Sequence, residues 1–509
     1  MKRIVCLSAF FLISVFCFGQ SYKINNVSYD ISGITREYAL SQKVPVDTTT
    51  VFTDSELFEK YITNLRQLLN NQRVFQSTEV QCTYLEENEN GVIPVDILII
   101  TQDTLNIIGF PYPSYNSNTG LALKIKVKDY NFFGSMEPMD FDINYQAPSA
   151  EQQIFGINFG FSVPFIIGKL PSSWNSSFGF EYTIGNPQMD MTICEGIGIS
   201  VPIANITSLN FSFNQYYIQK TAYSDAHDDK YFKEEAGLSI PFTVGEIPNW
   251  AAITWTPSIT FSYNWDADAF DGHPNSGIAT EKLIGPMLSF NHTVGAGRIN
   301  WIGNFRDGIS ASIGQTYNYN LHNNSETMYL TFNSQFHKKL CSFIGLSTRE
   351  YWYKDFYSNS AQFGSMVRGI RDYDWESSDY ILMNVDIPFK LFQTNWAKLF
   401  GWDKLNFIDF EFQVSPFLDI VLGENNNAGS DYKPKDGWYG AGMEMIVFPS
   451  RFRSIQGRVS FGVDAVQFLQ KAGHKVSQLD GMADKIFNTG WRTGASSWYE
   501  LSIGIGLFY

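Results

Sequence analysis

The feature that most constrains this fold is a strict alternation of apolar and polar residues that recurs along most of the chain. In LALKIKVKD, residues 121–129, the odd positions up to 127 are apolar and the even positions from 124 are lysines. Because successive side chains of a strand point to opposite faces, this pattern predicts a strand with one apolar and one charged face. The same period recurs in MDFDINYQ (139–146), FGINFGFSV (155–163), NFIDFEFQVS (406–415), GAGMEMIV (440–447) and RVSFGVD (458–464).

The length of these stretches separates two kinds of β-protein. Strands of a secreted soluble sandwich, the alternative fold, usually run to about 5–6 residues, whereas a strand that crosses a bilayer needs about 9–11. The alternating stretches approach the second length, and no run of 18 apolar residues after residue 20 would form a spanning helix. We therefore expect an all-β, antiparallel transmembrane barrel of about 16 strands, and up to 18, over residues 105–509.

The final stretch, WYELSIGIGLFY, predicts the strand at which the barrel closes on itself. Its odd positions from 501 are apolar and are expected to face lipid, while Glu500, Ser502 and the two glycines face the lumen. An outward aromatic at the end suits the membrane boundary, where one side is apolar and the other wet. The predicted seam strand consists of Leu501, Ser502, Ile503, Gly504, Ile505, Gly506, Leu507, Phe508 and Tyr509.

The first 20 residues, MKRIVCLSAFFLISVFCFGQ, have the basic start, apolar run and small residue of a secretory signal peptide. We expect cleavage after Gly19 or Gln20. The formal net charge of −15 disfavours a nucleic-acid partner, which requires a basic surface. Beyond the signal, Cys82, Cys194 and Cys341 are odd in number and widely spaced, so no disulfide framework is predicted.

Residues 20–104 follow a different pattern, which predicts a small α+β domain. INNVSYDI (24–31), STEVQCTYL (77–85) and VIPVDILII (92–100) are strand-like, and the segment 53–75 has apolar residues at helical spacing. Thr53 and Glu56 suggest a capping box before that helix. Two roles stay open: a spacer or plug, or a docking domain whose sheet edge accepts an extended client strand. In the second, the client-docking region is predicted around Phe58, Leu65 and Phe75.

Four motifs give the chain a resemblance to a known family. The pattern L-x-x-L-L-x-x-x-R-V-F at 65–75 precedes the barrel, an N-F-x-G turn lies in KDYNFFGSMEPMDFDINY (128–145), and MVRGI ends at Ile370. Together with SPFLDIVLG (415–423), they make the chain resemble the BamA/TamA superfamily of outer-membrane assembly and translocation proteins, with a periplasmic POTRA domain before the barrel. Ile370 replaces the family's aromatic, and Val421 stands where glycine is usual.

The resemblance implies a role for the charged loop at 366–375. In the family this loop folds into the barrel, so the motif Val367, Arg368, Gly369 and Ile370 is expected to lie in the lumen, with Arg368 paired to Asp419 and with Asp386 as a second candidate. The alternation independently turns both aspartates inward. Guanidinium suits this pairing because it stays charged and can bind a carboxylate through two parallel hydrogen bonds. The alternative is a solvated external loop.

The resemblance also implies a function: the first and last strands part sideways, and a client strand pairs with the exposed edge. The implied partners are the lipid bilayer, unfolded outer-membrane or secreted client proteins, and accessory periplasmic proteins or lipoproteins. The implied location is the outer membrane of a diderm bacterium, with residues 20–104 in the periplasm. A dedicated two-partner-type secretion pore is the alternative function, and a passive porin is a third.

No enzyme motif is present in the sequence. The six histidines are scattered, and no H-E-x-x-H, G-x-S-x-G or P-loop pattern occurs. We assign no catalytic residue, cofactor or metal ligand. The stretch DADAFDGH at 266–273 has three aspartates that could bind calcium, but Phe270 breaks the EF-hand spacing, and a solvated acidic loop is the simpler interpretation.

Overall fold

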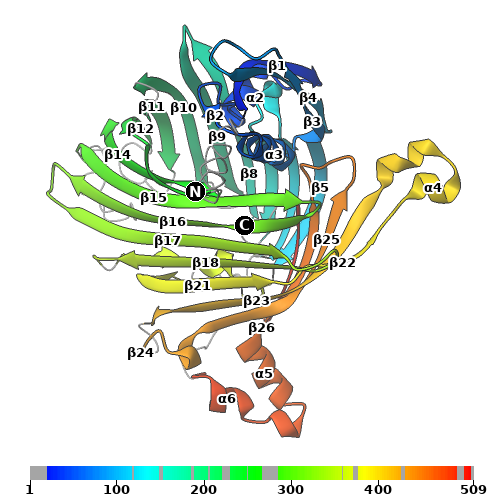
Figure 1. The fold of residues 1–509 in the computed structure, drawn as a ribbon. Coiled ribbons are helices and arrows are strands. Elements are labelled where there is room, and N and C mark those ends of the chain that lie inside the picture. The colour runs from blue at the N-terminus through cyan, green and yellow to red at the C-terminus, as the bar shows by residue number, and fades with distance from the viewer. Residues whose placement is uncertain are drawn as a thin grey trace, which may run out of the picture. The chain divides into compact units, whose positions relative to one another are not determined.

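The computed structural model divides the chain into two compact units, which Figure 1 shows as ribbons. One unit contains the residues up to Thr104 together with Gly134–Met136, and the other contains Leu105–Phe133 and the residues from Glu137 onward. The structure describes residues 20–505 except 117–119, 148–152, 185–187, 204–206, 221–229, 249, 266–284, 358, 371–375, 426–429 and 490–497. The predicted signal peptide, residues 506–509 and the DADAFDGH stretch lie outside the described residues.

The first unit is a four-stranded sheet with two helices. Its elements are β1 (Ser21–Ser32), α2 (Glu37–Lys43), β2 (Val51–Phe52), α3 (Ser55–Asn71), β3 (Phe75–Tyr84) and β4 (Val92–Asp103), with strand order β2-β1-β4-β3. β1 and β4 are parallel, and β3 is antiparallel to β4 at one edge of the sheet. The predicted small α+β domain is confirmed.

Two expectations for α3 need correction. The helix is capped by Asp54, whose side chain accepts a hydrogen bond from the Leu57 N–H, so the predicted cap at Thr53 is one residue early. Phe58, Leu65 and Phe75 are 1%, 1% and 0% exposed. Side chains buried to this extent form the domain's core and cannot contact a client, so the docking surface expected there does not exist at these residues.

The second unit is a closed antiparallel β-barrel. Its strands are β5 (Ile107–Asn116), β6 (Gly120–Asp129), β7 (Met139–Ala147), β8 (Gln153–Ile167), β9 (Leu170–Ile184), β10 (Gln188–Ile203), β11 (Thr207–Lys220), β12 (Lys230–Ser239), β13 (Phe242–Ile247), β14 (Ala251–Trp265), β15 (Met287–Ile302), β16 (Phe305–Asn320), β17 (Glu326–Lys339), β18 (Gly345–Asp355), β21 (Asp379–Asp386), β22 (Phe389–Gln393), β23 (Phe410–Asn425), β24 (Ser430–Asp431), β25 (Trp438–Pro449), β26 (Gly457–Asp464) and β27 (Tyr499–Ile505).

The barrel closes where β27 pairs with β5, as the final stretch predicted. β12 and β13 both pair with β14, and β21 and β22 both pair with β23, so each couple is one interrupted strand. Counted this way, and without the two-residue β24, the part of the barrel that the structure describes has eighteen strands. An even number is required because every neighbouring pair, the closing pair included, is antiparallel. The predicted barrel is confirmed, with a strand number at the upper limit of the expected range.

The two faces of the barrel wall differ as the alternation predicted. Apolar side chains on the outer face are exposed, as at Leu123 and Ile125 in β6 and at Ile309 and Ile313 in β16. On the inner face of β6 and β7, lysines lie opposite aspartates, and the Lys128 ammonium is 3.0 Å from the Asp140 carboxylate. A polar interior and an apolar exterior invert the arrangement of a soluble protein.

Short elements connect the barrel strands. They are the helices α4 (Trp396–Phe400), α5 (Ala465–Gly473) and α6 (Met482–Ile486), the 3-10 turns η1 (Phe132–Gly134), η5 (Gly364–Met366), η6 (Asp403–Ile408), η7 (Pro434–Asp436) and η8 (Ser477–Leu479), and the paired strands β19 (Ala361–Gln362) and β20 (Glu376–Ser377). Among the described residues, none of the helices has the length and apolar character needed to cross a membrane.

Candidate functional site

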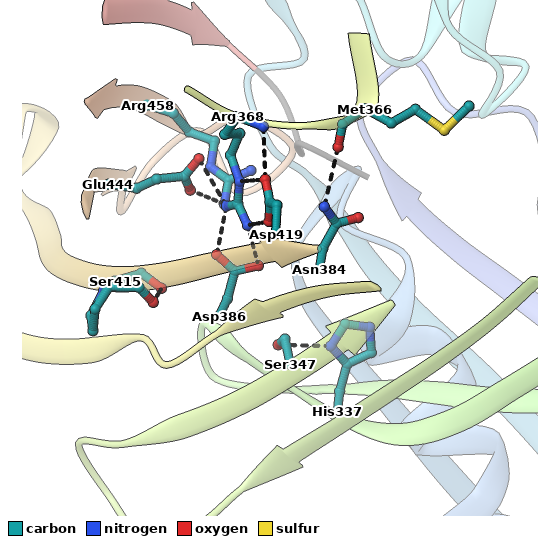
Figure 2. A network of polar contacts seen from close by, with 11 residues as sticks. His337, Ser347, Met366, Arg368, Asn384, Asp386, Ser415, Asp419, Glu444 and Arg458 are labelled. Atoms are coloured by element: carbon teal, nitrogen blue, oxygen red, sulfur yellow. Dashed lines mark hydrogen bonds and ion pairs between the residues drawn. The ribbon is translucent and has the colours of Figure 1, made fainter. Parts of the chain in front are cut away.

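The candidate site is formed by the loop between β18 and β21, which carries the V-R-G-I motif. After η5, residues 367–370 lie on the inner face of the barrel wall, and all four are buried. Figure 2 shows Arg368 of this loop with the acidic residues that surround it. The loop therefore lies in the lumen and is not a solvated external segment at these positions.

Arg368 binds two aspartates through five hydrogen bonds. Its Nε and Nη2 donate to the two carboxylate oxygens of Asp419, at 2.9 and 2.6 Å, and its backbone N–H donates to the same carboxylate at 2.8 Å. Its Nη1 and Nη2 donate to Asp386, at 2.7 and 3.4 Å. Asp419 thus binds the guanidinium in the bidentate geometry that arginine favours. The structure brings Arg368 together with both aspartates that the sequence singled out.

Further charges complete the network (Figure 2). The Arg368 Nη1 is 3.3 Å from Glu444, and the other oxygen of Glu444 is 2.6 Å from the Arg458 guanidinium. The Arg368 guanidinium also lies 3.9 Å from the centre of the Phe417 ring, a cation–π contact. Three carboxylates and two guanidiniums are thereby packed at one place in the lumen.

Burial makes these interactions strong and costly to break. Arg368 is 1% exposed and Asp419 is 0% exposed, so neither charge is screened by water. Burial alone would lower the pKa of the Arg368 guanidinium, but its hydrogen bonds to Asp419 and the charges of Asp386 and Glu444 raise that pKa above its usual value. Arg368 is therefore a cation held among three carboxylates, as expected for a guanidinium, which is not deprotonated in proteins.

The strand register explains how the partners come together. One inward-facing row runs from Asn384 in β21 through Asp419 in β23 to Gly440 in β25. The next row, two residues along the strands, begins at Asp386 and continues through Phe417, Gly442 and Gly462 to Glu500 in β27. The loop lies across these rows, so its partners come from five different strands.

Glycines in these rows allow the loop backbone to approach the wall. A Cβ at Gly440 would lie 2.1 Å from the Arg368 carbonyl oxygen, and a Cβ at Gly462 would lie 2.7 Å from the Gly369 nitrogen. Both distances are too short for a real side chain. Gly369 has a φ of +86°, a backbone conformation that residues other than glycine rarely adopt. A Cβ at Gly369 would also lie 2.6 Å from the Val463 nitrogen, so the motif glycine is needed for both conformation and space.

Apolar side chains hold the rest of the loop. Val367 and Ile370 are buried in a cluster with Phe363, Tyr380 and Trp438. The other members of this cluster are Tyr353, Leu382 and Val421. Val421 occupies the place where the family motif has glycine, and here it is 0% exposed and packs in this cluster. The departures from the motif at Ile370 and Val421 therefore both belong to this apolar cluster.

The loop is also tied to the last strand of the barrel. The Gly369 N–H donates a 3.0 Å hydrogen bond to the Glu500 carboxylate in β27. On the other side of the motif, the Asn384 side chain donates to the Met366 carbonyl at 3.1 Å. The loop thus connects the wall around β21 and β23 to the strand that closes the barrel.

Sequence reasoning missed several residues of this site: Glu444, Arg458, Phe417, Glu500 and the wall glycines. Their inward parity was visible in the alternating stretches, but their distance from Arg368 depends on the register between strands. Of the predicted seam strand, Leu501–Ile505 belong to β27, and residues 506–509 lie outside the described residues. In the described part of the chain, no group of three metal-ligating side chains could hold a metal ion.

Comparison with solved structures places the chain among distant neighbours. CdiB from Acinetobacter baumannii is 11% identical with a TM-score of 0.45, over 87% of this chain and 70% of that one. BamA from Haemophilus ducreyi lacking POTRA domains 1–3 is 12% identical with a TM-score of 0.36, over 87% and 81%. CdiB from Escherichia coli is 9% identical with a TM-score of 0.39, over 89% and 88%. No protein-family model and no curated protein matches the sequence.

Proposed function

We propose that this protein is an outer-membrane barrel of the BamA/TamA superfamily that assists the insertion of client proteins through a seam between β27 and β5. In this proposal the N-terminal domain lies in the periplasm and the V-R-G-I loop holds the lumen side of the wall. The observation that carries the proposal is the weakness of the closing pair.

Among the described residues, β27 and β5 share one registered pair, Leu501 with Tyr115. On its other side, β27 pairs with β26 along its whole described length. A transmembrane sheet normally satisfies its backbone groups along each strand, because lipid offers no hydrogen-bond partners. A closing pair with so little registered pairing is the place where such a barrel opens most easily.

Two prolines weaken the same seam. The β5–β6 ladder runs without a register shift through Pro111 and Pro113. A proline nitrogen carries no hydrogen, so these residues cannot form the hydrogen-bonded pairs of that ladder and must occupy the alternate positions. Their nitrogens therefore point toward β27, and the seam edge of β5 lacks two donors. Prolines at a strand edge are a known way of discouraging pairing.

Backbone pairing supplies the chemistry of the proposed function. An opened seam exposes unpaired N–H and C=O groups, and an extended client strand can add to such an edge with little regard to its sequence. In the first unit, β3 is an edge strand of ten residues that could deliver a client by the same kind of pairing. A two-partner-type secretion pore is the competing role. If the loop left the lumen, a secreted protein could pass through the barrel.

Depletion of the protein, followed by quantification of the outer-membrane and secreted proteomes in the same cells, tests the proposal. We expect a broad loss of other β-barrels, restored by the wild-type gene. Loss of a single secreted protein with all other barrels intact would instead identify a dedicated secretion pore.

A further inference from the structure

We propose that the connection between β22 and β23, residues 394–409, is an interfacial anchor that binds the headgroup region of an anionic phospholipid leaflet. We call this segment the tip. The inference rests on the barrel spanning a bilayer, but it is independent of what the barrel does with clients. In Figure 1 the β22–β23 hairpin carries α4 away from the neighbouring strands.

The tip is a folded element with defined hydrogen bonds at its base. The Asn395 side chain caps α4 by accepting from the Lys398 N–H, and the Asp409 carboxylate accepts from the Trp396 N–H at 2.8 Å. Gly401 ends the helix with a φ of +65°. The conformation of the tip is thus fixed by capping and turn residues rather than by burial of its apolar side chains.

The apolar side chains of the tip face outward. Leu399 is 69% exposed, Phe400 65% and Trp402 58%, and Phe407 and Ile408 are also exposed. No residue of α4 or η6 is buried. Five large apolar side chains are thus exposed within one connection. Exposed apolar patches of this kind mark sites that contact a membrane or another protein.

Continuity with the outer face of the barrel indicates what covers this patch. Leu391 and Phe392, which precede the tip on β22, are also exposed, and the Phe392 ring stacks on Phe412 at 5.4 Å. The apolar surface therefore continues from the outer barrel wall onto the tip. Because barrel strands alternate in direction, the tip lies at the same end of the barrel as the first residue of β5, Ile107.

Cationic side chains at and beside the tip favour a lipid with an anionic headgroup. Lys398 and Lys404 lie within it, and Arg451, from the adjacent β25–β26 turn, donates a 3.3 Å hydrogen bond to the Asn406 side chain. Asp403 and Asp409 balance the two lysines within the tip, so the excess positive charge at this place comes from Arg451 and Arg453 of the β25–β26 turn. Tryptophan, phenylalanine and leucine beside lysines are typical of segments that lie in a bilayer interface and contact anionic headgroups.

The test uses the protein from residue 20 onward, without the predicted signal peptide and its Cys6 and Cys17, with Cys82, Cys194 and Cys341 replaced by serine. It is folded into vesicles of phosphatidylcholine with or without phosphatidylglycerol. An environment-sensitive fluorophore is attached to Leu399→Cys, and brominated lipids quench it where it enters the bilayer. Lys169→Cys, in the short exposed β8–β9 turn at the same end, is the matched control. Ile313→Cys, on the exposed outer face of β16, reports insertion of the barrel itself.

We expect the label at position 399 to be quenched at least twofold more than the label at 169, and Lys398→Glu with Lys404→Glu to remove the added quenching that phosphatidylglycerol brings. If the label at 313 is quenched while that at 399 stays in water, the anchor is refuted and the membrane barrel stands. If neither is quenched, the barrel is not in the bilayer and both proposals fail. Equal quenching at 399 in both lipid mixtures would overturn the anionic preference.

Discussion

The loop–wall contact and the β27–β5 seam lie a few residues apart and are built in opposite ways. At the loop, Arg368 is 1% exposed and binds Asp419 and Asp386 through charged hydrogen bonds. At the seam, the described residues of the two strands share one registered pair, and two prolines remove donors from the edge of β5. Strong interactions fix one part of the lumen wall, whereas the closing edge is left weak. In the proposed function, the loop stays fixed to the wall while the seam opens.

The largest expected effect on client assembly comes from locking the seam with a disulfide between β5 and β27. Tyr115→Cys with Leu501→Cys, in a background without the native cysteines, places two thiols at the registered pair, where Cα atoms are about 5.5 Å apart and a disulfide can form. We expect oxidation to abolish client assembly in cells depleted of the wild type, and a reductant to restore it. Ser310→Cys with Gln335→Cys, a registered pair of β16 and β17, is the control. Full activity of the oxidised seam variant would exclude lateral opening.

The second effect comes from weakening the loop. Arg368→Ala leaves Asp419 and Asp386 buried without their cation, whereas Glu444 keeps its contact with Arg458, and breaking such a buried pair costs about 3–5 kcal/mol. We expect a folded barrel with a detached loop and strongly reduced activity, measured by heat-modifiable gel mobility, limited proteolysis and client assembly. Arg368→Lys should be intermediate, since an ammonium cannot make the bidentate contact. A variant with the wild-type protease pattern and full activity would show that the loop is dispensable.

A steric change can detach the loop without touching its charges. Gly462→Ala adds a Cβ 2.7 Å from the Gly369 nitrogen, and such overpacking costs about 1–3 kcal/mol. Gly457→Ala on the same strand is a matched control, because nothing lies within 4 Å of its added Cβ. We expect the first variant to become protease-sensitive at the loop and the second to behave as wild type. Equal behaviour of the two would contradict the close approach of loop and wall.

Two relations determine where the residues of this site lie: the parity of a residue along its strand and the register between neighbouring strands. Parity along a strand is a property of the sequence, so the inward positions of Asp386 and Asp419 followed from the alternation. Proximity across strands depends on register, which no single stretch encodes, and Glu444 and Glu500 were therefore missed. The resemblance, not the alternation, connected Arg368 with the two aspartates.

The N-terminal domain illustrates a different limit. Helical spacing correctly gave α3 an apolar face, but it could not tell whether that face is covered. Phe58 and Leu65 are both buried, and the Phe58 ring stacks on Tyr22 of β1. The cap was misplaced because Thr53 and Asp54 are adjacent residues of capping type, and only the backbone geometry selects Asp54. Leu399, Phe400 and Trp402 of the tip follow no strand period and gave no signal. Phe407 and Ile408 fall in the alternating stretch 406–415, but they belong to η6, and the strand begins only at Phe410.

A smaller change should strengthen the seam without locking it. Pro111→Val with Pro113→Val gives the seam edge of β5 two N–H groups, each worth about 0.5–1.5 kcal/mol when paired. We expect a more heat-resistant barrel and slower client assembly, measured by pulse-chase of a model barrel. Pro164→Val in β8, away from the seam, is the control. Faster assembly in the double variant would mean that the prolines do not limit closure.

The last expected effect concerns a contact that joins the two regions, the hydrogen bond from the Gly369 N–H to Glu500. Glu500→Ala removes the acceptor, and a hydrogen bond to a charged group contributes about 1.5–3 kcal/mol. Because this bond ties β27 to the fixed loop, its loss should leave the seam open more often, and cross-linking between Tyr115→Cys and Leu501→Cys should slow several-fold. Glu500→Gln keeps an acceptor oxygen and should slow it less, while Ser502→Ala on the same strand should have no effect. Unchanged cross-linking in Glu500→Ala would mean that the loop and the seam move independently, and that the strong contact does not restrain the weak one.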